Sequence, residues 1–398
     1  MAICMRERKA TVLALWSLCV WALLSFPIDA MADEWFPPKV ETYYSQNHRM
    51  RFTVTPRDIS SPLAYFDGKV KGEKLAGQLP NSAKTFAKGL LEQQDNTGRW
   101  TTIWDHQLVN DVSPVSAVVS NSGRYVATFD NWHSMGGGND AVVIYGPNAS
   151  VVRALSLRDI LPDYYVEALP RSVSSIWWSG EHHVAEPRDT LILRVVVPSE
   201  HDNVNSKRYV DLPLLLATGE VRSPMSGQWQ WALTQAASVA KAKREAEKSH
   251  DLWFRSPLIG PKNSSESDWQ TYLMEAFFRL DANWKDDFPW KTILRSPVDK
   301  DYADSEAWIR EDLDGTGGYG GTMMIASPAS PDNLIRFLQS TVRGLKKGTL
   351  KGRRVYVCVP AAYRDRAEEA LKATGATFVF LDPNAPIPQR KERLEAYH

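Results

Sequence analysis

The chain has 398 residues, which is long for a single hydrophobic core and predicts two or three domains. Its 47 basic residues balance 47 acidic residues, and this excludes a strong overall attraction to nucleic acid. The hydrophobic content of 43% and the charged content of 24% are those of an ordinary globular protein.

The N-terminus has the pattern of an export signal. Three basic residues precede an uncharged apolar run over residues 11–26, and Ala30-Met-Ala32 supplies the small residues that signal peptidase requires. We therefore expect a signal peptide over residues 1–32 and a periplasmic or secreted protein without a membrane span after cleavage. The run is slightly longer than most signals, so an uncleaved anchor is the alternative.

Cleavage after Ala32 would leave Cys358 without a cysteine partner in the chain. An exported protein of this kind depends on its core rather than on disulfides for stability. Cys358 lies in the apolar run Val355-Tyr-Val-Cys-Val359, which predicts a buried, unreactive thiol.

Residues 33–225 have the alternation and the turn residues of an antiparallel β domain. Turn sequences rich in Asn, Asp, Ser and Gly separate consecutive runs, as in Ser120-Asn-Ser-Gly123, and predict hairpins. The predicted strands cover residues 49–55, 85–92, 99–104, 115–119, 125–129, 141–145, 151–155, 172–178, 190–197 and 208–216. A helical segment over residues 157–169 is interrupted by Pro162. A propeller-like sheet, a sandwich or a barrel would each account for this pattern.

The middle of the chain, residues 226–300, changes to a helical period. Residues 229–248 are rich in Ala, Lys, Arg and Glu and predict a helix. A more amphipathic helix is predicted over residues 269–280, with Ser265 as the N-cap. We expect this region to be a helical connector.

The last part of the chain, residues 301–398, predicts a small α/β domain. Short apolar runs alternate with helical segments, and short connections of this kind favour a parallel sheet with right-handed crossovers. The predicted order is strand 322–326, helix 332–344, strand 354–359, helix 365–373 and strand 377–381. The whole chain is therefore predicted to be an α+β multidomain protein.

The loop Asp130-Asn-Trp-His-Ser-Met-Gly-Gly-Gly-Asn-Asp140 is longer and more polar than a hairpin requires. Asp130, His133 and Asp140 could converge on a metal ion, since a glycine-rich loop can fold around one. Trp132 beside Asn131 could stack on a sugar or a peptide. The alternative is a structured loop that bonds its own backbone. These five residues are the candidate ligand-binding site.

Two further motifs are weaker. His182 and His183 are adjacent, so on a strand they would point to opposite faces and could not share one zinc site. The glycine-rich segment from Asp312 to Thr322 contains a formal GxGxxG, but it precedes a strand instead of following one. The same segment has Met323 where a calcium loop requires Glu. We expect no cofactor, and no metal ligand or catalytic residue can be assigned.

The sequence Ser120-Asn-Ser-Gly-Arg-Tyr-Val-Ala-Thr128, followed by Val142-Val-Ile-Tyr-Gly146 and a turn, resembles one blade of a β-propeller. The likeness covers about forty residues and implies a four-stranded antiparallel sheet. The stretch also resembles uncharacterised bacterial exported proteins, for which there is no activity to transfer.

Two functions follow as hypotheses. The first is a binding or scaffolding module of the bacterial envelope, whose partner would be an envelope protein, a peptide or a carbohydrate. The second is a metal-dependent or carboxylate-dependent hydrolase acting on envelope material through Asp130, His133 and Asp140. The absence of a complete catalytic motif favours the first. The oligomeric state is left open by the sequence.

Overall fold

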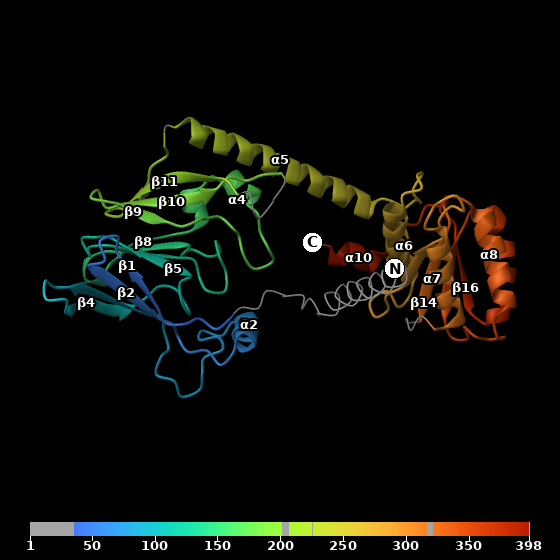
Figure 1. Ribbon diagram of the computed structural model, residues 1–398, viewed down its shortest axis with the longest axis horizontal. Helices are drawn as coiled ribbons and strands as arrows, with labels where there is room; N and C mark the ends of the chain where they lie inside the picture. The colour runs from blue at the N-terminus through green and yellow to red at the C-terminus, as the bar shows by residue number, and fades with distance from the viewer. Residues whose placement is uncertain (1–35, 201–206, 225, 317–320, 398) are drawn as a thin grey trace, which may run out of the picture. The chain divides into compact units, whose positions relative to one another are not determined.

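The computed structural model describes residues 36–200, 207–224, 226–316 and 321–397 (Figure 1). The chain forms two compact units, and the boundary lies inside helix α5 (Gly227–Arg255), between Lys243 and Arg244. The predicted signal peptide lies outside the described residues. Within these residues, no helix is both long enough and apolar enough to cross a membrane.

The fold is a mixture of helices and sheets, as the α+β prediction requires. The described residues form three antiparallel sheets, one parallel sheet and nine α-helices. The three antiparallel sheets belong to unit 1, and in each the four strands are neighbours in the order of the sequence. Sheet A contains β1 (Glu41–Tyr44), β2 (Met50–Thr55), β3 (Lys88–Gln94) and β4 (Trp100–Gln107); sheet B contains β5 (Ser116–Val119), β6 (Val126–Phe129), β7 (Val142–Tyr145) and β8 (Val151–Leu155); sheet C contains β9 (His183–Ala185), β10 (Thr190–Val196), β11 (Tyr209–Leu215) and β12 (Glu220–Val221).

The predicted hairpins are confirmed. Gly123 has a φ of 67° in the turn between β5 and β6, a conformation in which glycine avoids the strain of other residues. The predicted strand over residues 172–178 is wrong. The N–H of Ser172 donates to the carbonyl of Ser175 within the segment, and the N–H of Ile176 donates to the carbonyl of Met135 in the neighbouring loop. Most of the segment therefore contacts the loop between β6 and β7, and only its end meets sheet C, where the carbonyl of Trp178 accepts the N–H of Val196 at 2.8 Å.

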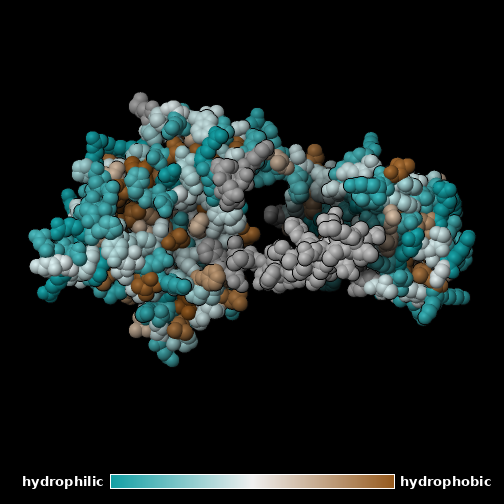
Figure 2. All heavy atoms as spheres, viewed as in Figure 1, coloured by the Kyte–Doolittle hydropathy of each residue, from teal (hydrophilic) through white to brown (hydrophobic). Residues whose placement is uncertain are grey.

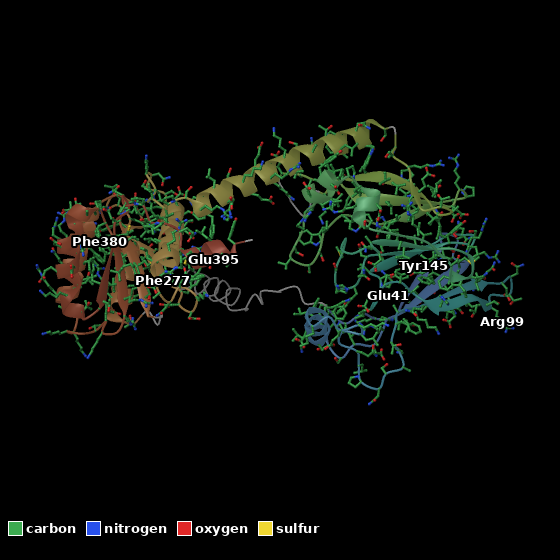
Figure 3. The ribbon with its side chains drawn as sticks, turned by 180° about the vertical axis from the view of Figure 1, so that it is seen from behind. Glu41, Arg99, Tyr145, Phe277, Phe380 and Glu395 are labelled. Carbon is green, nitrogen blue, oxygen red and sulfur yellow. The ribbon has the colours of Figure 1, made fainter. Side chains whose placement is uncertain are left out.

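Sheet B is buried on both faces. One face, which includes Phe129 and Ile144, shares a core with sheet C. The other face, which includes Val143 and Tyr145, shares a core with Phe52 of sheet A. Figure 3 shows Tyr145 within unit 1, away from the exposed Arg99 at a turn. All four residues of β6 and of β7 are therefore buried, which explains why β7 is a continuous apolar run and why Thr128 is the only polar residue of β6.

The outer faces of sheets A and C are polar. On sheet A, Arg51 forms an ion pair of 2.6 Å with Glu92, and its guanidinium lies 4.3 Å from the ring centroid of Trp100. On sheet C, the guanidinium of Arg194 lies 5.1 Å from the ring centroid of Tyr209. The stack of three sheets therefore ends in water on both sides.

Short helices complete unit 1. Helix α2 (Pro62–Val70) begins at the N-cap Ser61, whose side chain accepts from the N–H of Ala64. Pro162 separates α3 (Leu157–Ile160) from α4 (Asp163–Ala168), as predicted. The first part of α5 packs on this unit, with Trp229 stacked on Tyr165 at 5.8 Å between ring centroids.

Unit 2 contains sheet D, which is parallel throughout. Its strand order is β13-β14-β15-β16, so every crossover joins neighbouring strands. The strands are β13 (Trp290–Ile293), β14 (Thr322–Ala326), β15 (Arg354–Cys358) and β16 (Thr377–Leu381), and the helices are α6 (Glu266–Leu280), α7 (Tyr302–Asp314), α8 (Pro331–Arg343), α9 (Arg364–Leu371) and α10 (Lys391–Ala396). The parallel order predicted for β14 to β16 is confirmed.

Alternating side chains of sheet D enter two separate cores. Met323 and Ile325 of β14 pack with residues of α7, α8 and α9. Met324 and Ala326 of the same strand pack with residues of α6, including Phe277. The structure thus places α6 and β13 in the same unit as the small α/β domain, whereas the sequence assigned both to the connector region 226–300. The reason is that β13 hydrogen-bonds with β14 and α6 covers one face of the sheet.

The buried Arg279 of α6 hydrogen-bonds to Ile387 in the C-terminal segment. Arg279 is fully buried as a side chain and pairs with Glu275 at 2.8 Å. Its other nitrogens donate to the carbonyls of Phe254, Ser256 and Ile387 at 2.7–3.0 Å. Glu275 also accepts from Arg393 at 2.9 Å. One guanidinium therefore links the end of α5, α6 and the segment before α10.

Candidate functional site

The loop between β6 and β7 is held from inside by Asp130. This residue has a φ of 56°, in the left-handed region that Asp tolerates better than most residues. Its carboxylate accepts the N–H of Gly136 at 2.7 Å and the indole N–H of Trp178 at 2.9 Å. Asp130 and Trp178 are both buried, and burial raises the pKa of Asp130 to about 6. The carboxylate therefore bonds the loop to the Trp178 segment.

The other candidate residues of the loop also turn inward. Asn131 donates its amide to Asp140 at 2.9 Å. Trp132 is 7% exposed and donates its indole N–H to the carbonyl of Phe36 at 2.7 Å. The ring of His133 lies 4.8 Å from that of Tyr65 in α2, and its pKa is lowered by desolvation and by the charge of Lys69.

These contacts account for the length and polarity of the loop. Asn131 and Asp140 come together, Asp130 bonds to Trp178, and Trp132 and His133 pack against the aromatic cluster of Tyr65. Among the described residues, no group of three or more His, Cys, Asp or Glu side chains is arranged to hold a metal ion. These contacts hold the loop against the Trp178 segment and against Tyr65 of α2.

The two adjacent histidines lie in different environments, as alternation along a strand predicts: the ring of His182 is largely buried and His183 is exposed. His182 accepts the N–H of Arg194 through Nδ1 at 3.1 Å, and its ring lies 4.1 Å from that of Phe129. Burial lowers the pKa of His182 to about 3, so it is neutral at physiological pH. His183 is exposed at the start of β9.

The thiol of Cys358 is buried on β15, as predicted. Burial raises the pKa of Cys358 far above its ordinary value. Since the thiolate is the reactive form, this cysteine is structural at neutral pH.

Replacing Gly136 by alanine is expected to destabilise unit 1 by about 2–4 kcal/mol. Its φ is 67°, and an added Cβ would lie 2.9 Å from atoms of Ile176 and Leu157. Gly72 is the matched control, because its φ of 73° is similar but an added Cβ meets nothing within 4 Å. Urea unfolding should therefore show a much larger loss for Gly136→Ala than for Gly72→Ala. Equal losses would mean that the loop is not packed on Ile176.

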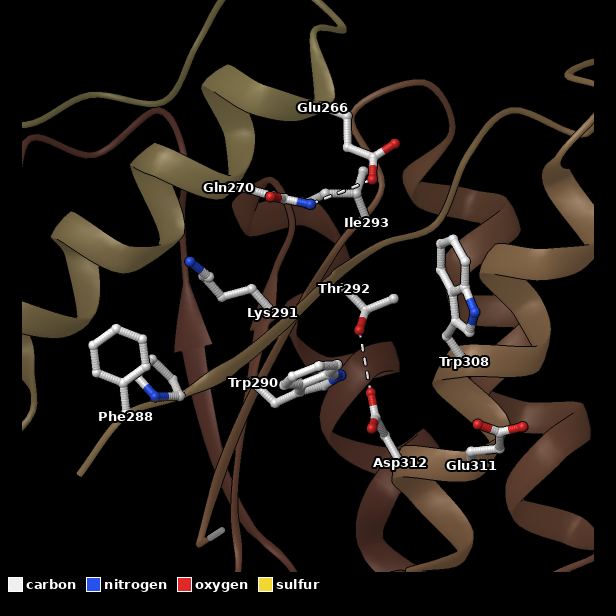
Figure 4. Close-up of a pocket in the computed structure, with 11 residues that line it drawn as sticks. Glu266, Gln270, Phe288, Trp290, Lys291, Thr292, Ile293, Trp308, Glu311 and Asp312 are labelled. Carbon is white, nitrogen blue, oxygen red and sulfur yellow. Dashed lines mark hydrogen bonds between the residues drawn. The ribbon is translucent and has the colours of Figure 1, made fainter. Parts of the chain in front are cut away.

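A groove runs beside β13 in unit 2 (Figure 4). Its volume is about 680 Å³, and β13 forms its floor between α6 and α7. No strand among the described residues pairs with the outer side of β13. Its lining includes Phe288, Trp290, Lys291, Trp308, Glu311 and Asp312.

The side chains of β13 divide between the two walls of the groove. Trp290 and Thr292 face α7, where the Thr292 hydroxyl donates to Asp312 at 3.1 Å. Lys291 points the other way, toward α6, and Ile293 enters the core beneath that helix (Figure 4). This alternation is the ordinary geometry of a strand.

The backbone of β13 divides in the same way. The N–H of Leu294 donates to the carbonyl of Ala326, so Leu294 and Thr292 direct their backbone groups toward β14. In a parallel pair, alternate residues direct both groups to one side. Lys291 and Ile293 therefore direct theirs toward the groove, which gives the groove a row of backbone donors and acceptors.

Exposed aromatic rings surround this edge. Phe288 is 71% exposed, Trp290 40% and Trp308 43%. The guanidinium of Arg295 lies 5.2 Å from the centroid of the Trp308 ring, so one side of that ring already contacts a cation. Aromatic rings that remain exposed beside open backbone groups are typical of binding surfaces.

Burial shifts the pKa values of two charged groups in the groove, Asp312 and Lys291. Desolvation raises the pKa of Asp312 to about 6, opposed by the hydrogen bond from Thr292. Desolvation also lowers the pKa of Lys291. Glu311 is exposed beside Asp312 on the α7 wall, so this wall carries carboxylates and aromatic rings.

The sequence analysis did not predict this groove. β13 has only four residues and follows a charged segment, so no alternation stands out. The available signal was the group Phe288-Pro-Trp290, two large aromatic residues directly before an apolar run. Comparison with family models, with curated proteins and with solved structures gives no match for this chain.

Proposed function

We propose that this chain is a binding or scaffolding protein that captures an extended peptide segment of a partner along the free edge of β13. The observation that carries the proposal is the open strand edge at the floor of a groove with exposed aromatic walls. An extended peptide adds to such an edge by main-chain hydrogen bonds, and the flanking side chains select its sequence.

The residues of the α7 wall favour particular side chains on the side of the peptide that would face them. Every second side chain of an added strand would face the α7 wall, which presents Trp290, Trp308, Glu311 and Asp312. Arginine or lysine at these positions would pair with the carboxylates and stack on the indole rings. The remaining side chains would face Lys291 and α6, where apolar or acidic residues fit.

The proposal includes the setting that the sequence suggests. We infer that the chain is exported and that its partner is a protein or peptide of the bacterial envelope. A carbohydrate would use the aromatic rings but would leave the backbone groups of Lys291 and Ile293 without a matching row of partners. An extended peptide could contact both the aromatic rings and these backbone groups, so it fits the groove better than a carbohydrate does.

We also infer that unit 1 is a propeller-like array of three blades. Each sheet is a four-stranded meander, and the first strands β1, β5 and β9 are neighbours from sheet to sheet. The polar outer faces of sheets A and C support an array that ends at three. Such an array would serve as a rigid scaffold.

The test is to remove one backbone donor from the groove. In Lys291→Pro the N–H that faces the groove is lost while the bonds to β14 are kept, because proline is tolerated on an edge strand. The probe is a synthetic peptide of alternating valine and arginine, measured by calorimetry. We expect Lys291→Pro to bind it at least about tenfold more weakly than the unmodified chain.

Two comparisons isolate the backbone contribution. Lys291→Ala removes the same side chain but keeps the N–H, so it should bind the peptide more tightly than Lys291→Pro does. A valine–glutamate peptide should bind weakly, since it would oppose Glu311 and Asp312. The proposal fails if the proline and alanine variants bind alike, or if the unmodified chain binds the two peptides equally.

A further inference from the structure

Sheet D has a second open edge, at β16. The order β13-β14-β15-β16 leaves the outer side of β16 without a strand partner among the described residues. β16 reads Thr377-Phe-Val-Phe-Leu381, and its three central residues are only partly buried. Hydrophilic residues cover most of the face of unit 2 that Figure 2 shows, and an apolar strand at the edge of the sheet contrasts with that surface.

Two aromatic residues of β16 direct their backbone groups away from the sheet. The N–H of Thr377 donates to the carbonyl of Arg353 beside β15. In a parallel pair, alternate residues direct both backbone groups to one side, so Phe378 and Phe380 direct theirs outward. The edge therefore offers backbone donors and acceptors to an added strand.

β16 lacks the features by which proteins usually protect an open edge. Such edges carry a lysine, a proline or a bulge, or they are covered by a helix or a loop. β16 contains no charged residue and no proline, and it pairs with β15 from Thr377 to Leu381 without a shift of register. An apolar edge of this kind is suited to pairing with another strand.

A groove of about 470 Å³ is lined by α9 and by the start of β16. Its lining includes Phe378 and three acidic residues of α9, which are Asp365, Glu368 and Glu369. Glu369 pairs with Lys372 at 3.1 Å, whereas Asp365 and Glu368 are exposed and form no ion pair within the described part of the chain. Two carboxylates are therefore available to a cationic ligand.

The arginines of α9 do not pair with these carboxylates. Arg366 pairs with Asp332 at 2.8 Å. The guanidinium of Arg364 lies 5.3 Å from the centroid of the Phe380 ring. Arg364 is thus the unpaired cation of α9 against the two unpaired carboxylates, which leaves an excess of negative charge beside the edge.

This charge discriminates among the strands that could add to β16. An antiparallel pair of β16 strands from two copies of the chain would bring Asp365 and Glu368 of both copies to the same face of the joined sheet, where like charges repel. The β13 edge of a second copy would bring Glu311 and Asp312 to that face, because α7 and α9 cover the same face of sheet D. A segment with arginine or lysine would be attracted instead.

We propose that the β16 edge is a second peptide-binding site, which takes an extended segment with basic and apolar residues in alternation. The basic side chains would face Asp365 and Glu368, and the apolar side chains would lie beside Val379, which packs on the α6 side of the sheet. The inference takes its ligand class from the proposed function of the β13 groove but rests on a different edge. A partner with two such segments would gain affinity by binding both edges of sheet D.

The experiment counts the peptides that bind to the whole chain by calorimetry, with the synthetic valine–arginine peptide as the probe. Asp365→Lys and Glu368→Lys together reverse the charge of the β16 groove without changing β16. Glu392→Lys is the control, because Glu392 is exposed in α10 and lines neither groove. Lys291→Pro weakens the β13 site, so that the β16 site can be measured alone.

We expect the unmodified chain to bind two peptides and Lys291→Pro to keep one tight site. Adding Asp365→Lys and Glu368→Lys to Lys291→Pro should weaken that site at least about tenfold, because two attractive contacts become repulsive. Adding Glu392→Lys instead should change it by less than about twofold.

The outcomes distinguish the two sites. A single peptide per chain that Lys291→Pro loses would overturn the β16 inference and leave the proposed function of β13 intact. A single peptide that Lys291→Pro keeps and the two lysine substitutions release would support the β16 site and contradict the β13 site. Equal binding by the lysine pair and by Glu392→Lys would overturn the inference, and no binding at all would overturn both proposals. Sedimentation that shows a dimer of the unmodified chain, dissociated by Phe380→Pro, would also overturn it, because a second copy would then occupy the edge.

Discussion

Replacing Arg279 by methionine is expected to lower the free energy of unfolding of unit 2 by about 3–5 kcal/mol. The methionine would leave the carbonyl of Ser256 without the donor that Arg279 supplies. The carbonyls of Phe254 and Ile387 would each lose one of two donors, because Gln389 and the N–H of Leu258, respectively, also bond to them. A buried acceptor that loses its partner costs about 1–3 kcal/mol. Glu275 would keep Arg393 and Gln389 as partners. The loss therefore comes from the unpaired Ser256 carbonyl and from the other charge-assisted hydrogen bonds that Arg279 donates.

The control for this prediction is Arg255→Met. Arg255 pairs with Asp251 in the same i,i+4 spacing as Arg279 with Glu275, but both side chains of that pair are nearly half exposed. Exposed pairs contribute about 0–1 kcal/mol. Urea unfolding followed by circular dichroism should therefore separate the two variants by at least about 2 kcal/mol. Equal losses would show that Arg279 acts as an ordinary surface charge.

Replacing Asp130 by asparagine is expected to remove a pH dependence of the stability of unit 1. The folded pKa of Asp130 is about 6, above its ordinary value of 3.8, because burial opposes the charged form. The folded state therefore binds more protons than the unfolded state between these values. The stabilisation from this group is complete below about pH 4 and is lost as the pH rises through about 6.

Asparagine suits position 130 because it tolerates the positive φ and keeps one oxygen acceptor for the N–H of Gly136 or Trp178. Between pH 4 and 6 we expect the free energy of unfolding of the unmodified chain to fall by about 2–3 kcal/mol relative to that of Asp130→Asn. Asp140 lies close enough to raise the same pKa. Urea unfolding at half-unit pH steps measures the difference.

Two other groups, His182 and Asp159, change the stability of unit 1 with pH in the opposite direction to Asp130. His182, with a pKa of about 3 in the folded state, contributes in the opposite direction, since its stabilisation is lost as the pH falls below about 6.5. His182 is present in both chains, so its contribution cancels in the comparison.

Asp159→Asn is a contrasting variant. The pKa of Asp159 is lowered by hydrogen bonds from Ser156, so the stabilisation from Asp159 is lost as the pH falls. Parallel pH curves for Asp130→Asn and the unmodified chain would refute the prediction.

The sequence was informative where local chemistry decides the structure. Turn residues such as Gly123 marked the hairpins of sheet B, and the apolar runs that became β14 and β16 gave those strands their observed bounds. The helix that covers sheet D was predicted to begin after Ser265, whose side chain does cap it. These signals lie within a few residues of one another, so they can be read without the fold.

The features that were missed depend on contacts between distant residues. Trp178 was read as part of a strand, but its indole bonds to Asp130, forty-eight residues earlier in the chain. β13 became a strand because β14 pairs with it, and four residues carry too little pattern to indicate this. The polar character of the loop from Asp130 to Asp140 was visible in the sequence, whereas the inward direction of its side chains was not.

The double burial of sheet B has a consequence for how the chain can be divided. A fragment that ended before β9 would expose Phe129 and Ile144 to water, and a fragment that began after β4 would expose Val143 and Tyr145. Each cut would create a broad apolar sheet face of the kind that drives aggregation. Neither half of unit 1 can therefore stand as a separate folding module, and any shuffling or insertion that preserves the protein must leave all three sheets together.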